Sequence, residues 1–305
     1  MVDLPRELAV RRAAFEWLRR QVDLFGDVLS RQLLAEGFEF EGQRIPLLSP
    51  QGIFTPKALD LPISIATAPA GPYDDAFSRD GGTLLYRYRG TDPHHRDNVL
   101  LRRTKELGIP LCYFHGVVPG RYLAVWPVFV QGDNPAALTF TVAVDDAAMV
   151  AASSEEGVGQ VDEEAVGRRR YLTAVVQRRL HQRGFRERVL RAYREHCAVC
   201  RLAHRELLDS AHIIPDGEPD GDPIVPNGLA LCSLHHAAFD GRLIGIRPDY
   251  VIEVRRDVLL EHDGPMLIHG LQALHQIRIE VPHAAPLRPD PERLDVRYRR
   301  FREAA

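Results

Sequence analysis

Two short knuckles of metal-binding residues lie in the C-terminal half of the chain. The first is Cys197-Ala-Val-Cys200 and the second is Cys232-Ser-Leu-His235. Three of the four cysteines of the chain fall in this arrangement, and paired CxxC and CxxH knuckles supply four ligands for a closed tetrahedral zinc site. We therefore expect a structural zinc ion here, because a disulfide is the weaker explanation in a reducing cytosol.

A second group of polar residues lies between the knuckles and just after them. It contains His212, Asn227 and His236, together with the carboxylates of Asp209 and Asp240. A histidine titrates near neutral pH and can take a proton from water, and imidazole and carboxylate groups are ligands for divalent cations. A structural zinc ion requires none of these residues. The alternative interpretation, a non-catalytic zinc module that binds DNA, leaves them without a role.

The order and spacing of these elements resemble the HNH endonuclease family, in its McrA-like branch with AHI, NGL and CxxHHxxFD motifs. The resemblance implies a zinc-stapled ββα-metal nuclease domain that hydrolyses DNA phosphodiester bonds. By this resemblance His212 is the general base that activates water, and Asn227 braces the loop that orients it. His236 then binds a catalytic cation, for which Mg²⁺ or Mn²⁺ suits the oxygen and nitrogen ligands.

One position departs from the family pattern. Many members have a metal-ligating Asp or His immediately before the base, where this chain has Ala211. Asp209 lies on the same face if the segment is a strand, so it is a candidate ligand, although it is also explained as a carboxylate at a strand end. Asp240, one helical turn beyond His236, matches a position that ligates metal in some members.

Length and composition indicate a protein with two domains. The chain has 305 residues, of which 45% are hydrophobic and 27% are charged, as in soluble globular proteins. No apolar run approaches the length of a membrane helix, and the first residues do not read as a signal peptide, so we expect a cytoplasmic protein. We predict an α+β fold with a mixed α/β DNA-reading domain (1–150), a hinge and Arg-rich helical connector (151–190) and the nuclease domain (191–305).

Hydrophobic periodicity places the main elements. We expect one amphipathic helix over residues 5–36, ended by Gly37, and an Arg-rich helical stretch over 162–193 with Gly184 as a candidate break. The remaining predictions are a small polar hinge (150–160), a helix (94–107), strands (83–89, 111–115, 122–130 and 138–144) and a hairpin after the nuclease motif (243–246 and 250–254).

Positive charge is concentrated in one segment although the chain has a net charge of −3. From Arg168 to Arg205 there are twelve arginines and only two acids, Glu187 and Glu195. Such an excess indicates phosphate binding, and a solvated helix face is the alternative.

A softer resemblance covers the region from Leu61 to Val130. This region, with its segment from Leu85 to Leu100, is similar to the sulfur-binding domain of phosphorothioation-dependent restriction enzymes of the McrA-like class. The resemblance implies a shallow apolar cup for sulfur, formed by the stem of Arg96 with Leu100, Ala124, Trp126, Pro127 and Val130. It also implies that His95 and Arg96 contact phosphate or a guanine edge. Without the resemblance, the stretch 122–130 reads as an ordinary core strand and His95 and Arg96 as a solvated helix start.

The leading functional hypothesis is therefore a type IV restriction endonuclease that binds phosphorothioated double-stranded DNA and cuts nearby. A second hypothesis directs the same nuclease to methylated or hydroxymethylated cytosine, which requires a deep aromatic pocket for a flipped base. The shape of the pocket discriminates between them. A homodimer is possible, because double-strand cleavage by a nuclease with one site needs two copies or two independent nicks.

Overall fold

The computed structural model describes residues 2–68, 76–77, 83–145 and 163–303. The chain divides into two compact units, Met1–Arg183 and Gly184–Ala305. Both units contain helices and strands, so the predicted α+β class is confirmed. None of the helices in these described ranges is both long enough and apolar enough to cross a bilayer. The predicted hinge at 150–160 lies outside the described residues.

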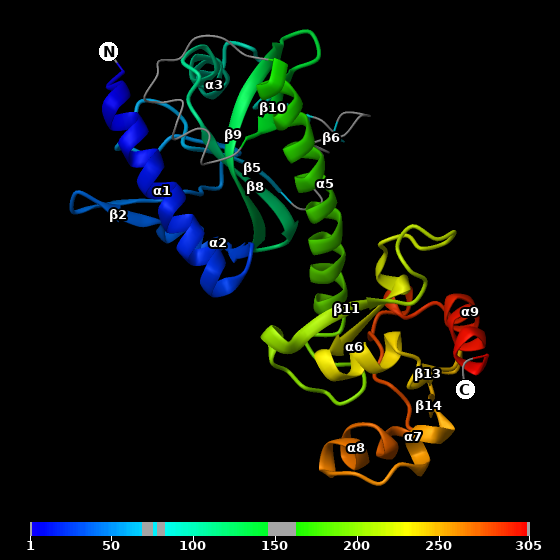
Figure 1. The fold of residues 1–305 in the computed structure, drawn as a ribbon. Coiled ribbons are helices and arrows are strands. Elements are labelled where there is room, and N and C mark those ends of the chain that lie inside the picture. Colours follow the sequence, from blue (N-terminus) through cyan, green and yellow to red (C-terminus); the bar gives the residue numbers. More distant parts are fainter. Residues whose placement is uncertain (1, 69–75, 78–82, 146–162, 304–305) are drawn as a thin grey trace. The chain divides into compact units, whose positions relative to one another are not determined.

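The first unit is built on a mixed sheet of eight strands (Figure 1). Seven strands follow the order β4-β5-β8-β9-β10-β7-β6, and β1 pairs with β9. β5 and β8 run parallel, whereas β8, β9, β10 and β7 are successively antiparallel. The strands are β1 (Val28–Ser30), β4 (Ile53–Phe54), β5 (Ser64–Thr67), β6 (Ala76–Phe77), β7 (Leu84–Arg87), β8 (Leu111–Val118), β9 (Arg121–Asn134) and β10 (Thr139–Val144), and β2 (Phe38–Phe40) and β3 (Gln43–Ile45) form a separate hairpin.

The N-terminal segment contains two helices, and the expectation of one helix over 5–36 was wrong. Helix α1 (Leu4–Phe25) ends at Gly26, whose φ of 77° a helix cannot continue. Strand β1 then pairs with β9, and helix α2 (Arg31–Glu36) follows, with the side chain of Ser30 capping its N-terminus. The end at Gly37 was predicted correctly, since its φ is 66°.

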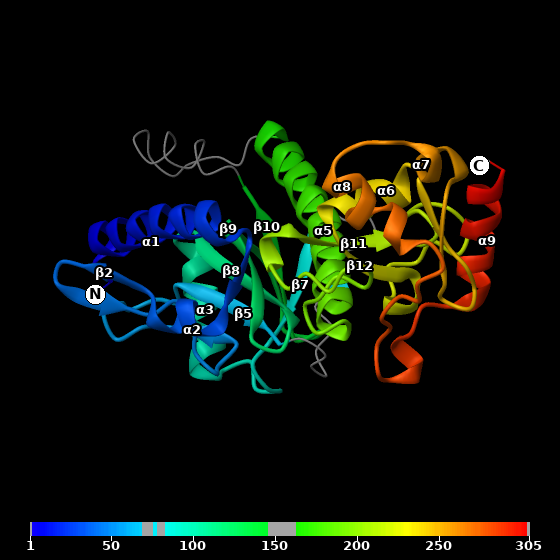
Figure 2. The same cartoon turned by 90° about the horizontal axis from the view of Figure 1, so that it is seen from below.

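Two hydrophobic clusters form the core of the first unit. Helix α1 covers the sheet through Val10, Ala14 and Leu18, which cluster with Phe114 and Ala124 (Figure 2). Helix α3 (Arg96–Glu106), which lies between β7 and β8 in the chain, contributes Leu101 to the other cluster. The second cluster includes Tyr86, Tyr88, Tyr113 and Val130.

Helix α5 (Glu163–Ala192) is a single helix with no break at Gly184. Gly184 is buried, and the next residues Phe185, Val189 and Leu190 belong to the core of the second unit. Burial of these large side chains outweighs the cost of about 1 kcal/mol that glycine imposes on a helix.

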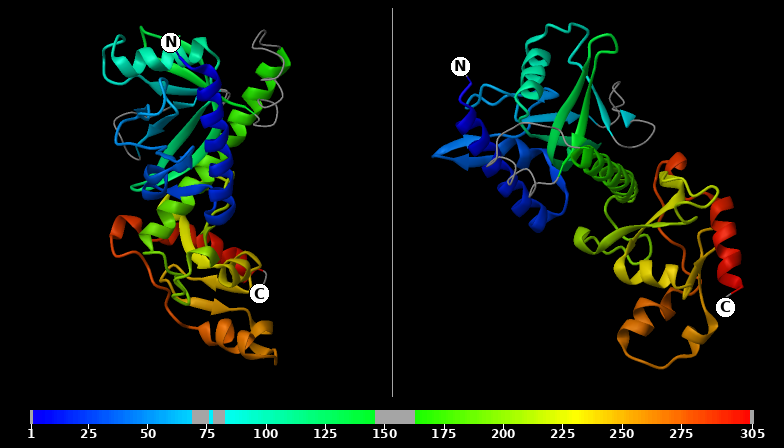
Figure 3. Two further views of the ribbon diagram at one scale, coloured as in Figure 1. Left: turned by 90° about the vertical axis from the view of Figure 1, so that its left-hand side faces the viewer. Right: turned by 45° about the horizontal axis from the view of Figure 1, so that its top comes forward.

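The second unit is built around a two-stranded antiparallel sheet and the helix that follows it. Strands β11 (Leu208–His212) and β12 (Gly228–Cys232) lead into α6 (Ser233–Asp240), which gives the predicted ββα order. The predicted hairpin is confirmed as β13 (Ile244–Ile246) and β14 (Ile252–Val254). Helices α7 (Arg256–Leu260) and α8 (Pro265–Gly270) follow, and α9 (Pro291–Arg302), red in Figure 3, packs against β13.

Candidate functional site

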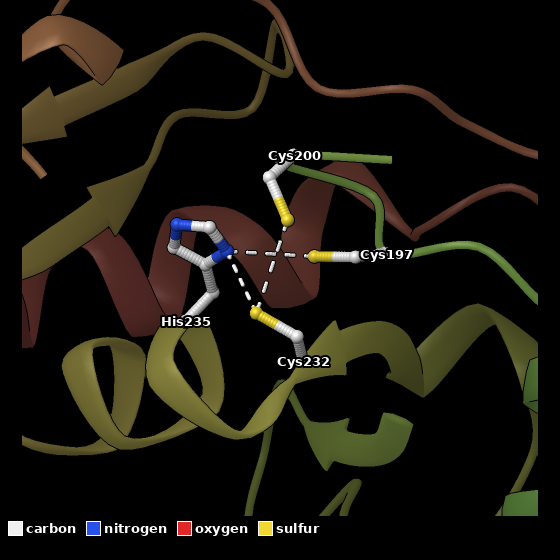
Figure 4. Close-up of side chains that lie close together, drawn as sticks. All are labelled: Cys197, Cys200, Cys232 and His235. Carbon is white, nitrogen blue, oxygen red and sulfur yellow. Dashed lines mark hydrogen bonds between the residues drawn. The ribbon is translucent and has the colours of Figure 1, made fainter. Parts of the chain in front are cut away.

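Three cysteines and one histidine converge in the second unit. Cys197 and Cys200 follow α5, Cys232 ends β12, and His235 lies in the first turn of α6 (Figure 4). Their ligand atoms all lie within 4.8 Å of one another, with Nδ1 of His235 3.1 Å from Sγ of Cys232. These four residues, the Cys3His quartet, therefore have the arrangement of a tetrahedral metal site.

The surroundings of the Cys3His quartet favour metal binding. Nε2 of His235 lies 2.9 Å from the carbonyl oxygen of Gly270, and donation of its proton there leaves the lone pair of Nδ1 for a metal. The hydrogen bond from the thiol of Cys232 is the main cause that holds the pKa of Cys197 well below its usual range. A thiolate is the form of cysteine that binds metal, so Cys197 is set to bind a metal ion.

His212 ends strand β11, and its ring packs against Phe185 of α5. The ring centroids are 4.1 Å apart and the rings are inclined by 22°. Nε2 of His212 is buried and has no hydrogen-bond partner among the described residues. Burial lowers the pKa of His212, so the ring is neutral at neutral pH, as a proton acceptor must be.

Asn227 fixes the loop that follows His212. Its Oδ1 accepts from the backbone N–H of Ile214 at 2.8 Å, and its Nδ2 donates to the carbonyl oxygens of Ile214 at 3.0 Å and Asp222 at 3.1 Å. The next residue, Gly228, has no room for a side chain, because a Cβ would lie 2.4 Å from Val189. The loop is thus held at both ends beside His212.

His236 lies between the two predicted carboxylates. Nδ1 is 3.4 Å from Oδ2 of Asp209, and Nε2 is 3.2 Å from Oδ2 of Asp240. The hydrogen bond that Asp209 accepts from the ring is the main cause that raises the pKa of His236. The residues that the sequence pattern singled out thus come together at one place on β11 and α6.

The HNH endonuclease family model matches residues 197–247. This segment is an HNH endonuclease domain. The match spans the Cys3His quartet, His212, Asn227 and His236. The predicted relationship to the HNH family and the predicted enzyme class, a DNA endonuclease, are therefore confirmed.

Comparison with solved structures gives weaker similarities. A modification-dependent restriction endonuclease, TagI, is 18% identical over 80% of this chain and 81% of its own, with a TM-score of 0.29. The type IV phosphorothioation-dependent restriction endonuclease ScoMcrA is 16% identical over 83% of this chain, which spans 56% of its length, with a TM-score of 0.25. Neither superposition is close enough to establish a shared overall fold. No curated protein matches.

The donor atoms of the HNH domain also suit a second, harder cation. His236 offers a ring nitrogen and two carboxylates lie beside it, which are ligands of the kind that Mg²⁺ and Mn²⁺ take. Among the described residues, however, only the Cys3His quartet brings three or more ligand atoms within 4.8 Å of one another. The ligand atoms of Asp209, His236 and Asp240 therefore do not all lie within this distance of one another.

Three residues beside the site were not predicted from the sequence. Phe185 packs on His212, Arg186 lies 3.4 Å from Asp209, and Arg297 donates to Oδ1 of Asp240 at 3.1 Å. Arg297 belongs to α9 and its guanidinium also lies 4.7 Å from the centre of the Phe239 ring. All three lie outside the matched segment, so motif spacing carried no signal for them.

Five of the twelve arginines in the segment 168–205 form ion pairs with acids among the side chains that the structure describes. This pairing leaves less free positive charge than the composition indicates. The described pairs are Arg169 with Asp145, Arg183 with Asp27, Arg186 with Glu187 and Asp209, Arg201 with Glu280, and Arg205 with Glu187 and Glu195.

The residues predicted for DNA reading lie at or on two elements of the first unit, α3 and β9, which contact each other. Arg96 is exposed and Leu100 half-buried on α3, and His95 caps that helix by accepting from the backbone N–H of Asp97. On β9, Ala124 is buried in the cluster under α1 and Trp126 packs against it, whereas Val130 is buried in the other cluster. Pro127 is buried as well. The structure therefore does not gather the predicted cup residues in one cluster.

Proposed function

We propose that this chain is a modification-dependent type IV restriction endonuclease that recognises modified double-stranded DNA and hydrolyses a nearby phosphodiester bond. The arrangement of His212, Asn227 and His236 in the HNH domain carries the nuclease part of the proposal, because a zinc module that only binds DNA needs none of them. Cleavage of plasmid DNA with added Mn²⁺ separates the two functions, since the non-catalytic module would leave the plasmid intact.

In the proposed reaction His212 is the general base. Its neutral ring takes a proton from a water molecule, which attacks phosphorus in line with the leaving oxygen. Phe185 and Asn227 keep the ring and the following loop in place during this step. Residues of the chain thus supply the proton acceptor and its orientation.

A divalent cation, Mg²⁺ or Mn²⁺, would be held by His236 with Asp209 or Asp240 and would supply positive charge to the phosphoryl and leaving oxygens. The Cys3His quartet would hold a structural zinc ion, whose binding free energy stabilises the folded domain. The two metals would have separate roles, because the quartet consists of soft ligands and the His236 group of hard ones.

We assign modification reading to the region 1–150, connection to 151–190 and cleavage to 191–305. The first candidate for the reader is the sulfur cup implied by the resemblance of the N-terminal region. An apolar cup would disfavour a strongly hydrated phosphate oxygen more than a softer sulfur, so specificity would come from rejecting ordinary DNA. One observation argues against the sulfur cup, because Ala124 and Val130 belong to two different core clusters.

A specific pocket favours the second candidate, a modified base such as methylated or hydroxymethylated cytosine. The pocket has a volume of about 500 Å³ and lies in the first unit. Tyr86, Tyr88 and Tyr122 line it, together with Arg31, Arg87 and Arg89. The rings of Tyr86 and Tyr88 are buried in the core, so Tyr122 is the ring available to stack on a base, while the arginines can hold the flanking phosphates. The volume of the pocket and its arginines favour a modified base, whereas a sulfur site needs only a shallow apolar surface.

Competition binding at fixed salt tests the reader. The competitors are a plain duplex, a duplex with one methylated or hydroxymethylated cytosine, and duplexes with one phosphorothioate of either stereochemistry. A base pocket predicts tighter binding of a modified-cytosine duplex, and this preference should fall in Tyr122→Ala. Preference for one sulfur stereoisomer instead would assign the reader to the cup, and equal affinity for all duplexes would remove the modification from the proposal.

A further inference from the structure

His236 is contacted by one carboxylate at each ring nitrogen, although a neutral imidazole has only one N–H donor. The distances are 3.4 Å from Nδ1 to Asp209 and 3.2 Å from Nε2 to Asp240. One of the two nitrogens of the neutral ring must therefore present its lone pair to a carboxylate. That contact is unfavourable unless a proton or a metal cation lies between the two groups.

Asp209 has the contacts of a residue that orients the ring. Its Oδ1 accepts from the backbone N–H of Ser210 at 2.8 Å and lies 3.4 Å from Nε of Arg186. Arg186 is fixed in turn, since it donates to the carbonyl oxygen of Leu208 at 2.6 Å. Oδ1 of Asp209 is thus occupied by groups of the protein, and Oδ2 is placed to accept from Nδ1–H of His236.

Asp240 has one oxygen held and the other directed at the ring. Arg297 donates to its Oδ1 at 3.1 Å, which leaves Oδ2 beside Nε2 of His236. Asp240 also follows His236 by one turn of the same helix, α6, so one rigid element presents both groups. A cation between Nε2 and Oδ2 would therefore take two of its ligands from α6.

We propose that Asp209 is a positioning residue that accepts the Nδ1–H of His236, and that Nε2 of His236 and the carboxylate of Asp240 bind the divalent cation. The inference rests on the proposed nuclease function and assigns the two carboxylates different roles. Histidine ligands generally donate their second ring N–H to a carboxylate, which fixes the tautomer. In this assignment Asp209 does not replace the ligand that is missing at Ala211.

Mn²⁺ binding to the zinc-loaded full chain, measured by the EPR signal of free Mn²⁺, tests the assignment. Asparagine keeps a carbonyl oxygen that accepts an N–H, but it is a poor ligand for a hard cation. Asp209→Asn should therefore bind Mn²⁺ nearly as well as wild type, whereas Asp209→Ala should bind about tenfold more weakly. Asp240→Asn should bind Mn²⁺ more than about tenfold more weakly than wild type. Arg299→Gln, which removes an exposed charge from α9, is the control and should not change binding.

Several outcomes would overturn the assignment. If Asp209→Asn weakens Mn²⁺ binding more than Asp240→Asn does, the two roles are reversed. If both variants weaken binding equally, both residues are ligands. DNA cleavage by the wild type is measured in parallel. If the wild type cleaves DNA but the variants show the reversed order of Mn²⁺ affinities, the assignment is refuted and the nuclease function stands. If the wild type neither cleaves DNA nor binds Mn²⁺, both the assignment and the nuclease function are refuted.

Discussion

Phe185 and His212 stack with their ring centroids 4.1 Å apart, although they lie on different elements of the second unit. The phenyl ring covers one face of the imidazole and contributes to the burial that lowers the pKa of His212. An apolar contact from α5 thus contributes to the environment of the residue that we propose as the general base.

The pH dependence of cleavage should reflect this contact. Because burial lowers the pKa of His212 from 6.5, its neutral form predominates at pH 7 and is lost as the pH falls through the lowered pKa. The acid limb of kcat/KM should therefore lie below pH 6.5 in the wild type. In Phe185→Ala the ring is less buried, so the limb should move toward higher pH.

Phe185 is also a core residue, so its removal costs about 3–5 kcal/mol of stability. Val189→Ala removes volume from the same core on the same helix and serves as the control, with an unshifted acid limb. An acid limb that stays in place in Phe185→Ala would show that the stacking does not set the pKa of the base.

Zinc removal should unfold the nuclease domain, because metal binding contributes folding free energy at such sites, about 10–16 kcal/mol in small zinc-binding peptides. Cys232→Ser should contain less than one equivalent of zinc and melt at a lower temperature. Cys112→Ser is the matched control, since Cys112 is buried in the first unit outside the quartet. Zinc analysis and calorimetry measure both. A Cys232→Ser protein that is fully folded without zinc would contradict the structural role.

Arg297 should matter for cleavage although it lies far from the motif in the sequence. Its hydrogen bond to Asp240 fixes that carboxylate, and the ring of Phe239 fixes the guanidinium. We expect Arg297→Gln to lower kcat about tenfold, the usual cost of losing a group that orients a metal ligand. Arg299→Gln changes the same charge at an exposed position of α9 and should cleave normally. Equal rates for the two variants would exclude a role for Arg297.

The chemistry-bearing residues were predictable because they are close in sequence and constrained by ligand geometry. The knuckle Cys232–His235 and the succession of His212, Asn227 and His236 lie within one ββα unit, and the knuckle Cys197–Cys200 lies shortly before it, so the whole site comes from one short segment. The resemblance to the HNH family then supplied the roles. The family match over residues 197–247 and the hairpin of β13 and β14 agree with the prediction of a nuclease domain.

The supporting residues were not predictable in the same way. Phe185 and Arg297 reach the site through tertiary packing of helices outside the motif, which leaves no periodic signal. The helix predicted over 5–36 failed because a left-handed glycine, Gly26, lies within a continuous amphipathic pattern. The apolar side chains of β9 pack into two different core clusters. The sequence of β9 is apolar in either case, so it did not tell us whether the strand belongs to the core or lines a binding cup.

Single-turnover cleavage by His212→Ala tests the central claim most directly. If His212 is the general base, the rate should fall by about 10²- to 10⁴-fold, while DNA affinity at fixed salt stays near that of wild type. His204→Ala, an exposed histidine of the same unit, should cleave at the wild-type rate. His212→Ala protein that still cleaves at nearly the wild-type rate would contradict the proposed mechanism.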